Sequence, residues 1–253
     1  MPRMRESETR STTTRALALL DAVAAHPGST LSLSELADAA GLPLATAHRY
    51  ARELVAWGGL ERTPEGRYRL GLRVWQLGTR TRWDRALRQA SAPILDRLAL
   101  ATGIAACAMS YTDGEVVTVE RRWGKDRSTW ISPIGRALPV FVSTAGRLLA
   151  AHAGDAERAR LSAALPASAA DAFDRDLART RARGYAVELD LVRAGQGAVS
   201  VAVPGPHARD VALTYVFPDD EVRVAERHLD DLRLAAAALS VALARAEPPA
   251  PSP

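Results

Sequence analysis

Apolar residues recur every three or four positions in three successive segments near the start of the chain, which predicts three amphipathic helices. The first spans about residues 14–25 and stops at a His-Pro-Gly sequence. The second follows Ser32, because Ser32 and Glu35 have the S-x-x-E spacing of a capping box. The third covers about residues 44–57 and ends at a Gly-Gly pair. Its predicted apolar face consists of Ala47, Tyr50, Leu54 and Trp57.

The spacing then changes to that of short strands. Residues 60–62 and 67–70 are separated by the turn sequence TPEG, which predicts a β-hairpin. A tight turn, Gly-Leu-Pro at residues 41–43, joins the second and third helices. Helix, helix, tight turn, helix and hairpin is the order of a winged helix-turn-helix. Such a unit lays its last helix in the major groove of DNA, while the hairpin reaches the neighbouring backbone.

Charge supports this interpretation only locally. The formal net charge of the 253 residues is +4, so the chain as a whole is not a polycation. Between Leu44 and Arg73, however, six arginines stand against three glutamates. Arginine can bind phosphates or a guanine edge, although an ion-paired, solvated surface is the alternative for any one of them. The predicted DNA-binding residues are Ser34, Thr46, His48, Arg49, Arg52, Arg62, Arg67, Tyr68 and Arg69.

The rest of the chain predicts a larger unit of segregated helices and antiparallel strands, and hence an α+β protein. An amphipathic segment over residues 72–102 predicts a linker helix followed by a first domain helix. Two alternating runs around the turn sequence TDG then predict a hairpin. Further strands are expected at residues 128–131 (STWI), 197–203 and 210–217, and further helices from about residue 141 and over 156–164, 170–183 and 221–245.

A resemblance to a known family rests on residues 31–78. They read LSLSELADAAGLPLATAHRYARELVAWGGLERTPEGRYRLGLRVWQLG, with SELA, GLP, T-x-H-R and GRYRLG in order. This segment resembles the DNA-binding domain of the IclR family of bacterial transcriptional regulators. The resemblance implies a sequence-specific DNA-binding regulator that does not act as an enzyme. Leu44 and Ala45 stand where family members often carry Lys-Ser, so the resemblance does not predict the operator sequence.

A second resemblance concerns the segment IGRALPVFVSTAGRLLA. It is similar to a marker of the GAF-like effector-binding domain of this family, although Val140, Phe141, Ser143 and Thr144 depart from the pattern. The resemblance implies a small-molecule effector of the organic acid class. The start of a helix suits a carboxylate, because its first N–H groups are unsatisfied. The implied effector-binding residues are Met109, Trp130, Arg136, Phe141, Ser143, Thr144 and Ser200.

Several functions lack support in the sequence. There is no G-x-S-x-G or H-E-x-x-H motif and no phosphate-binding loop, and one cysteine, Cys107, cannot form a thiolate-rich zinc site or an intrachain disulfide. We therefore expect no enzyme, no cofactor and no metal. No window approaches the ~20 apolar residues of a membrane span, so we expect a cytoplasmic protein. The alternative function is a winged-helix protein-interaction module without a functional effector pocket.

These observations predict a domain plan and a set of partners. The expected partners are double-stranded operator DNA, a small-molecule effector and further copies of the chain, as a homodimer or a dimer of dimers. The apolar residues Val74, Trp75 and Leu77 are the candidate seam between copies. The predicted parts are a disordered N-terminus (1–12), a winged helix-turn-helix domain (13–71), a linker helix (72–90), a GAF-like effector-binding domain (79–246) and a disordered tail (247–253).

Overall fold

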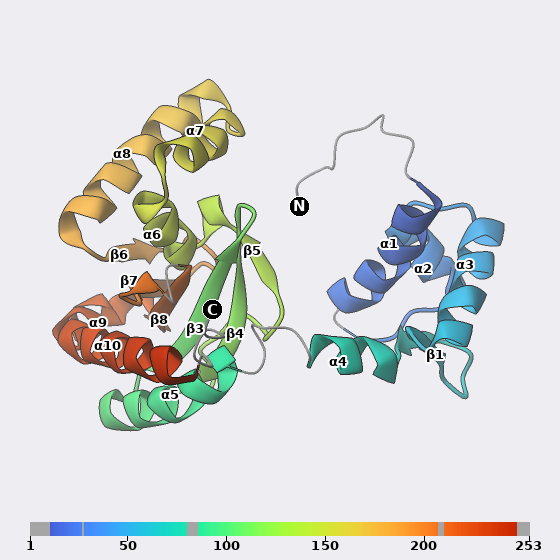
Figure 1. The fold of residues 1–253 in the computed structure, drawn as a ribbon, viewed down its shortest axis with the longest axis horizontal. Coiled ribbons are helices and arrows are strands. Elements are labelled where there is room, and N and C mark those ends of the chain that lie inside the picture. The colour runs from blue at the N-terminus through green and yellow to red at the C-terminus, as the bar shows by residue number, and fades with distance from the viewer. Residues whose placement is uncertain (1–10, 27, 80–85, 207–209, 247–253) are drawn as a thin grey trace, which may run out of the picture. The chain divides into compact units, whose positions relative to one another are not determined.

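The structure is a computed structural model that describes residues 11–26, 28–79, 86–206 and 210–246 (Figure 1). The chain divides into two compact units, Met1–Thr81 and Arg82–Pro253. The predicted tail lies outside the described residues, as do residues 1–10 of the predicted N-terminus and residues 80–85 of the predicted linker helix.

The first unit has the predicted order of a winged helix-turn-helix. Its second helix begins with the predicted capping box: Ser32 Oγ accepts from the Glu35 N–H (3.3 Å), and Glu35 Oε2 accepts from the Ser32 N–H (2.7 Å). The first helix begins at Thr12 with Ser11 as its N-cap, so regular structure starts inside the stretch expected to be disordered. The elements are α1 (Thr12–Ala25), α2 (Leu33–Ala40), α3 (Leu44–Trp57), β1 (Leu60–Arg62), β2 (Tyr68–Leu70) and α4 (Leu72–Gly78).

A close backbone contact joins the end of the hairpin to the end of α3. Gly71 donates its N–H to the Gly59 carbonyl (2.8 Å). A Cβ atom on Gly71 would lie 2.1 Å from the carbonyl oxygen of Gly58, which is far inside van der Waals contact. Only glycine therefore fits at position 71. This contact fixes where the wing and α4 leave the helical core.

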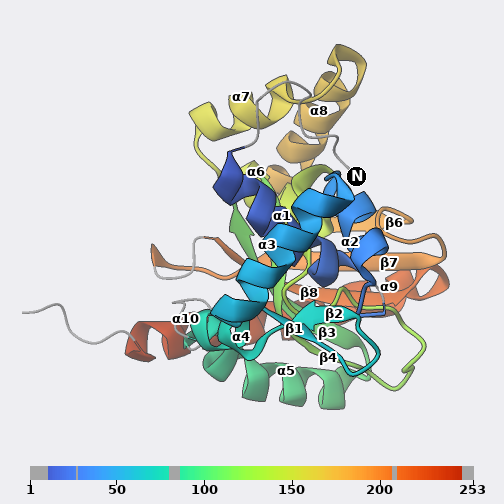
Figure 2. The same cartoon turned by 90° about the vertical axis from the view of Figure 1, so that its right-hand side faces the viewer.

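The second unit is an antiparallel sheet with helices on both faces (Figures 1 and 2). Its six strands have the order β5-β4-β3-β8-β7-β6, and every neighbouring pair is antiparallel. The predicted α+β class is confirmed. The strands are β3 (Ala105–Thr112), β4 (Glu115–Arg122), β5 (Ala137–Pro139), β6 (Ala186–Leu189), β7 (Gln196–Ala202) and β8 (Val211–Pro218). The helices are α5 (Arg88–Thr102), α6 (Thr144–His152), α7 (Asp155–Ala163), α8 (Ala167–Arg183), α9 (Val222–Arg227) and α10 (Leu229–Ala246), with 3-10 turns η2 (Val140–Val142) and η4 (Asp219–Glu221).

The two faces of the sheet are packed differently. Helices α5 and α10 cover one face, where Leu95, Leu232 and Leu239 join a large cluster with Tyr215 and Phe217. Helix α6 covers the other face, where it packs on β3 and β8. The predicted hairpin between β3 and β4 turns at Asp113 and Gly114, both with positive φ (47° and 83°), as a two-residue hairpin loop requires.

Three expectations for this unit were wrong in detail, and two strands were not expected. STWI (residues 128–131) forms no strand. The helix expected near Phe141 begins at Thr144, because a 3-10 turn occupies Val140–Val142. The last helix, expected to be continuous, is broken between α9 and α10. Strands β5 and β6 were missed because they are only three and four residues long.

The contact at Gly71 gives a prediction. Gly71→Ala should lower the unfolding free energy of the first unit by about 2–3 kcal/mol, because the added methyl group overlaps a backbone carbonyl. Gly78→Ala is the matched control, since a Cβ atom there meets nothing within 4 Å. Urea unfolding followed by circular dichroism measures both variants. Equal stability of Gly71→Ala and the unchanged protein would contradict the packing described.

Candidate DNA-binding surface and effector cavity

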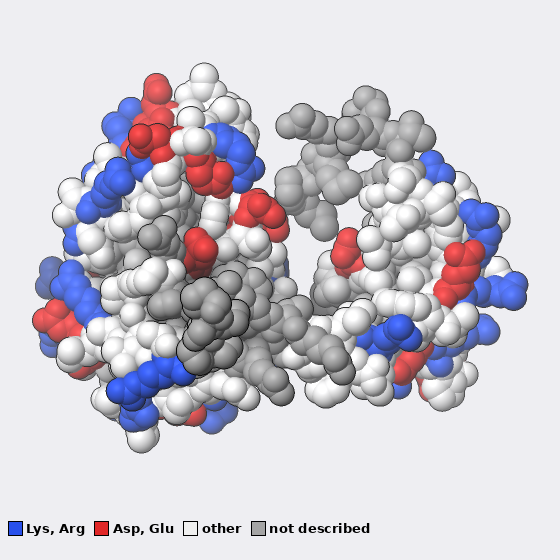
Figure 3. All heavy atoms as spheres, viewed as in Figure 1, with Lys and Arg blue, Asp and Glu red and all other residues white. Residues whose placement is uncertain are grey.

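The outward face of α3 carries unpaired basic side chains. His48, Arg49 and Arg52 are exposed, and Thr46 is half-buried. The Arg49 guanidinium lies over the Tyr50 ring, 4.8 Å from its centroid. Neither Arg49 nor Arg52 forms a hydrogen bond or ion pair with any described residue. In Figure 3, basic side chains with an acidic group among them lie over α3.

The three wing arginines have different surroundings. Arg69 is exposed and forms an ion pair across the hairpin with Glu61 (2.8 Å), and the hydrogen bond from Arg69 lowers the pKa of that carboxyl. Arg62 is also exposed and, among the described residues, donates only to the Gly66 carbonyl of the turn (3.5 Å). Arg67 instead holds the wing to α2. It donates to the Thr30 carbonyl (3.1 Å) and to Glu35 Oε2 (2.8 Å).

Two further predicted DNA-binding residues lie beside this surface. Ser34 is exposed in the first turn of α2, where its Oγ lies 3.3 Å from Ser32 Oγ. Tyr68 is only 5% exposed, and its side chain belongs to the core of the first unit. Its assignment to DNA contact is corrected. Side chains alternate along a strand, so Arg67 and Arg69 point outward while Tyr68 between them points inward.

The start of α3 presents an apolar surface. Leu44 is 54% exposed and Ala45 is also exposed. The N-cap position is Pro43, which makes no side-chain capping bond. The first turn of the helix therefore offers a docking partner methyl groups in place of the amine and hydroxyl of a Lys-Ser pair.

The second unit contains a cavity between the sheet, the first turn of α6 and the loop after β6. The cavity encloses about 530 Å³ of atom-free space, counting its opening to solvent. Its wall is formed by Cys107, Met109, Trp130, Ile131, Ser132, Leu138, Ser143, Thr144, Ala145, Glu188, Leu191, Val192, Arg193, Gln196, Gly197, Ala198, Thr214 and Val216.

Four of the seven residues proposed for the effector lie on this wall, namely Met109, Trp130, Ser143 and Thr144. The other three do not. The exposed Arg136 guanidinium lies 5.6 Å from the Trp130 ring centroid. Phe141 packs edge-on against Phe173 (5.1 Å between centroids). Ser200 lies behind the wall and bonds to Thr214 Oγ1 (2.8 Å).

The first turn of α6 places backbone donors at the cavity. Ser143 is the N-cap, and its Oγ accepts from the Gly146 N–H (3.3 Å). Among the described residues, nothing accepts from the N–H groups of Thr144 and Ala145, and both residues line the cavity. Free N–H groups at the positive end of a helix dipole attract an anion.

The acidic residue on the wall is already paired. Glu188 lies 3.3 Å from Arg147 Nη1, which also binds Asp176 (2.7 Å). Arg147 is only 16% exposed and donates in addition to the Phe141 carbonyl (3.0 Å). Asp176 also pairs with Arg179, so the two arginines and two carboxylates of this cluster carry no net charge and do not repel a negatively charged ligand. It also ties α6 to α8 and β6.

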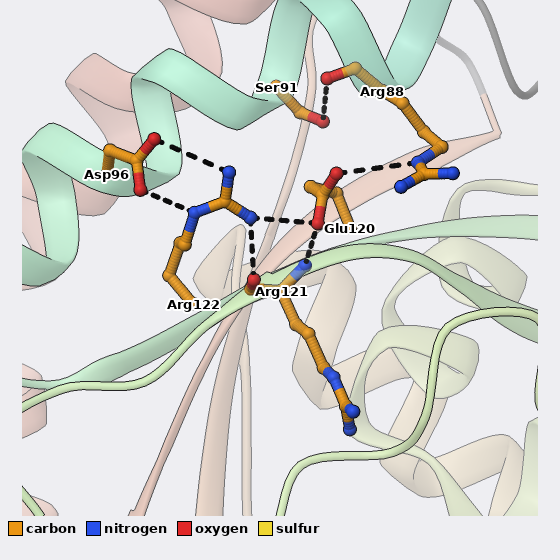
Figure 4. Close-up of polar contacts among 6 residues, drawn as sticks. All are labelled: Arg88, Ser91, Asp96, Glu120, Arg121 and Arg122. Atoms are coloured by element: carbon orange, nitrogen blue, oxygen red, sulfur yellow. Dashed lines mark hydrogen bonds and ion pairs between the residues drawn. The ribbon is translucent and has the colours of Figure 1, made fainter. Parts of the chain in front are cut away.

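A second polar cluster joins β4 to α5 on the opposite face of the sheet (Figure 4). Glu120 is buried and accepts from Arg122 Nη1 (2.8 Å), from the Arg121 N–H (3.0 Å) and from Arg88 Nε (3.4 Å). Arg122 also binds Asp96 of α5. In Figure 4 the Arg121 side chain leaves β4 away from α5.

The Arg121 side chain connects this strand to the cavity. Its Nη1 donates to the Ile131 carbonyl (2.8 Å), and Ile131 lines the cavity. Neighbouring residues of β4 thus hold the cavity wall on one side, through Arg121, and the first turn of α5 on the other, through Glu120. A buried, fully bonded carboxylate between arginines is costly to break.

None of the helices in the described ranges combines the length and hydropathy that crossing a bilayer requires. Nor do the described residues gather three His, Cys, Asp or Glu side chains into a metal-binding group.

A winged helix-turn-helix unit followed by an α+β unit with a cavity beside its sheet is the arrangement of ligand-responsive transcriptional regulators. Comparison with known protein families identifies the family to which this chain belongs. Residues 12–64 match the IclR helix-turn-helix domain, and residues 83–243 match the C-terminal domain of the bacterial transcriptional regulator IclR. The chain belongs to the IclR family of DNA-binding transcriptional regulators.

Individual relatives agree with the family. The chain is 33% identical over 200 residues to the HTH-type transcriptional regulator XynR of Escherichia coli, covering 75% of this chain and 78% of XynR. It is 32% identical over 191 residues to the glycerol operon regulatory protein of Streptomyces griseus, covering 72% and 74%. Among solved structures, an IclR homolog from Microbacterium hydrocarbonoxydans complexed with 4-hydroxybenzoate superposes with a TM-score of 0.81 at 26% identity, over 93% of this chain and 100% of that one.

The burial of the single cysteine, Cys107, gives a prediction about its reactivity. Burial raises the pKa of Cys107 to about 12, so at pH 8 only on the order of one thiol in ten thousand is the reactive thiolate. The folded protein should therefore react with a thiol reagent such as DTNB many times more slowly than urea-unfolded protein, which is the control. Rapid stoichiometric labelling of the folded protein at pH 8 would contradict the burial of Cys107.

Proposed function

We propose that the protein binds double-stranded operator DNA with α3 in the major groove and the wing on the neighbouring backbone. The observation that carries this proposal is the pair of exposed, unpaired arginines on α3, Arg49 and Arg52. Both are free to bind phosphates or base edges without first breaking an ion pair. Arg62 and Arg69 contact the DNA backbone, whereas Arg67 positions the wing through Glu35 and Thr30.

The apolar start of α3 suggests part of the base preference. Leu44 and Ala45 reach the groove first in this docking mode, and apolar side chains contact the methyl group of thymine. We propose that a thymine lies opposite this turn. Thr46 and His48 supply short hydrogen bonds beside it, and Arg49 spans a guanine edge.

Two variants separate base reading from backbone binding. Arg49→Ala should relax specificity at one position of each half-site, because a bidentate arginine–guanine contact discriminates by about 1–3 kcal/mol. Arg69→Ala should weaken binding to all sequences alike. It should also reduce by about 1 the slope of log affinity against log salt concentration. Genomic fragments captured by the purified protein provide the operator, and single-base variants of it are titrated at two salt concentrations.

The two outcomes that oppose this assignment are distinct. Uniform weakening by Arg49→Ala would make Arg49 a phosphate clamp and leave DNA binding intact. Binding that is insensitive to salt would instead favour a protein-interaction module, because phosphate contacts release counterions and make affinity fall steeply with salt.

We infer further that a small organic acid binds in the cavity and controls DNA binding. The free N–H groups of Thr144 and Ala145 would receive its carboxylate, and Met109, Trp130 and Leu138 would pack on its apolar part. The 4-hydroxybenzoate complex of the Microbacterium hydrocarbonoxydans homolog supports a ligand of this class. The protein has no enzymatic role in this proposal and acts in the cytoplasm, where its operator lies.

Strand β4 offers a route from the cavity to the chain that leads to the first unit. A ligand that shifts Ile131 changes the position of Arg121, and the adjacent Glu120 holds Arg88 at the start of α5. Coupling of this kind is reciprocal: an effector that weakens operator binding is itself bound less tightly by the DNA complex.

We propose that the working form is a homodimer or a dimer of dimers. One recognition helix reads only a few base pairs, and paired half-sites are the usual way to reach useful specificity. Helix α4 supplies an apolar surface for a second copy, since Leu72, Trp75 and Leu77 are 59%, 66% and 51% exposed. Val74, the other residue of the predicted seam, is half-buried.

Light scattering tests the proposed oligomeric state. The unchanged protein should have at least twice the 27.1 kDa mass of one chain at micromolar concentration, and Trp75→Ser should raise the dissociation constant of the dimer about tenfold or more. Leu100→Ser is the control, because Leu100 is 86% exposed on α5. A monomer that binds the operator with full affinity would exclude the dimer.

A further inference from the structure

Ser132 on the cavity wall has an unsatisfied hydroxyl. The residue is 6% exposed, yet its Oγ has no hydrogen-bond partner. Two other buried hydroxyls of the wall are bonded, Ser143 Oγ to the Gly146 N–H and Thr214 Oγ1 to Ser200 Oγ. Within the described part of the wall, Ser132 holds the only buried side-chain oxygen without a partner. An unpaired buried hydroxyl lowers stability, so such a group in a cavity points to a ligand.

The wall around Ser132 is held in place by neighbours. Arg121 binds the carbonyl of Ile131, the preceding residue, and stacks on the Trp123 ring 4.6 Å from its centroid. Further back, Asp126 accepts from the Ser128 N–H (2.8 Å). These contacts fix the backbone that carries Ser132. A backbone held in this way preorganises the Ser132 hydroxyl for a ligand.

The charge around Ser132 defines the group that it can bind. The guanidinium of Arg121 already binds a carbonyl, and the cation on the wall, Arg193, belongs to the loop between β6 and β7. One hydroxyl cannot compensate the burial of a full negative charge, whereas it bonds well to a neutral oxygen. The start of α6, with its free N–H groups, suits the carboxylate better.

We infer that Ser132 is a specificity-determining residue that bonds a hydroxyl or carbonyl oxygen which the effector carries in addition to its carboxylate. The effector class is therefore a hydroxy- or oxo-substituted organic acid with an apolar middle. This inference rests on the proposed effector site. A ligand without the second oxygen leaves the Ser132 hydroxyl unpaired and binds more weakly.

Calorimetric titration with benzoate and the three monohydroxybenzoates tests the ligand class. At least one hydroxylated isomer should bind about 5- to 10-fold more tightly than benzoate, which is the value of one neutral hydrogen bond. In Ser132→Ala this preference should disappear while the affinity for benzoate stays unchanged. Ser128→Ala is the matched control, because Ser128 belongs to the same loop but not to the cavity wall, and it should keep the preference.

A second measurement needs no ligand. Ser132→Ala should melt at the same or a higher temperature than the unchanged protein, because it removes an unpaired hydroxyl. Ser143→Ala should melt lower, because it removes the N-cap of α6. A lower melting temperature for Ser132→Ala would show that its hydroxyl has a partner within the protein, and would overturn the inference.

The titration outcomes separate this inference from the proposal beneath it. If benzoate binds and no hydroxylated isomer binds better, or if Ser132→Ala keeps the preference, the role of Ser132 is refuted and the carboxylate site stands. If none of the four compounds binds, the role of Ser132 toward a hydroxylated aromatic acid is refuted, whereas the proposed carboxylate site, which requires no aromatic ring, is not. Operator binding, measured separately, is unaffected by either result.

Discussion

The close packing of α6 on the turn before it is the constraint on which the second unit depends. A Cβ atom at Gly146 would lie 2.7 Å from the Cα of Val140, so only glycine lets the helix approach the turn this closely. The first turn of α6 is thereby fixed above the sheet, with the N–H groups of Thr144 and Ala145 at the cavity. Without this contact there would be neither a wall opposite the strands nor a positive helix end directed at the ligand.

Much of the fold could be predicted because its signals are local. The capping box at Ser32, the TPEG turn of the wing and the TDG turn between β3 and β4 each specify a conformation within a few residues. The errors arose where local signals are weak. Strand β5 has only three residues and pairs at the sheet edge, and STWI has the composition of a strand without a partner to pair with. Whether each of these segments forms a strand depends on pairing with residues far away in the sequence.

The functional sites were less predictable, because the role of each side chain depends on partners that are distant in the sequence. The sequence shows that Arg67 is basic, but it does not show that Glu35 and Thr30 accept hydrogen bonds from its guanidinium. It identifies Ser200 as polar, but not that Thr214 lies between Ser200 and the cavity. Nothing in the sequence distinguishes Ser132 from other serines. What distinguishes it is the lack of a partner in a buried place, a property that no spacing of residues reveals.

The cluster around Glu120 has a consequence for the behaviour of the protein in concentrated salt. Its carboxylate is buried against Arg88 and Arg122, so mobile ions screen these attractions only weakly. The contacts that we propose between arginines on α3 and DNA phosphates would lie in solvent and would weaken steeply as ions accumulate. Rising ionic strength would therefore detach the protein from DNA well before it loosens β4 from α5. A cell under osmotic stress would hold a pool of regulator that is released from its operator but still folded around its cavity.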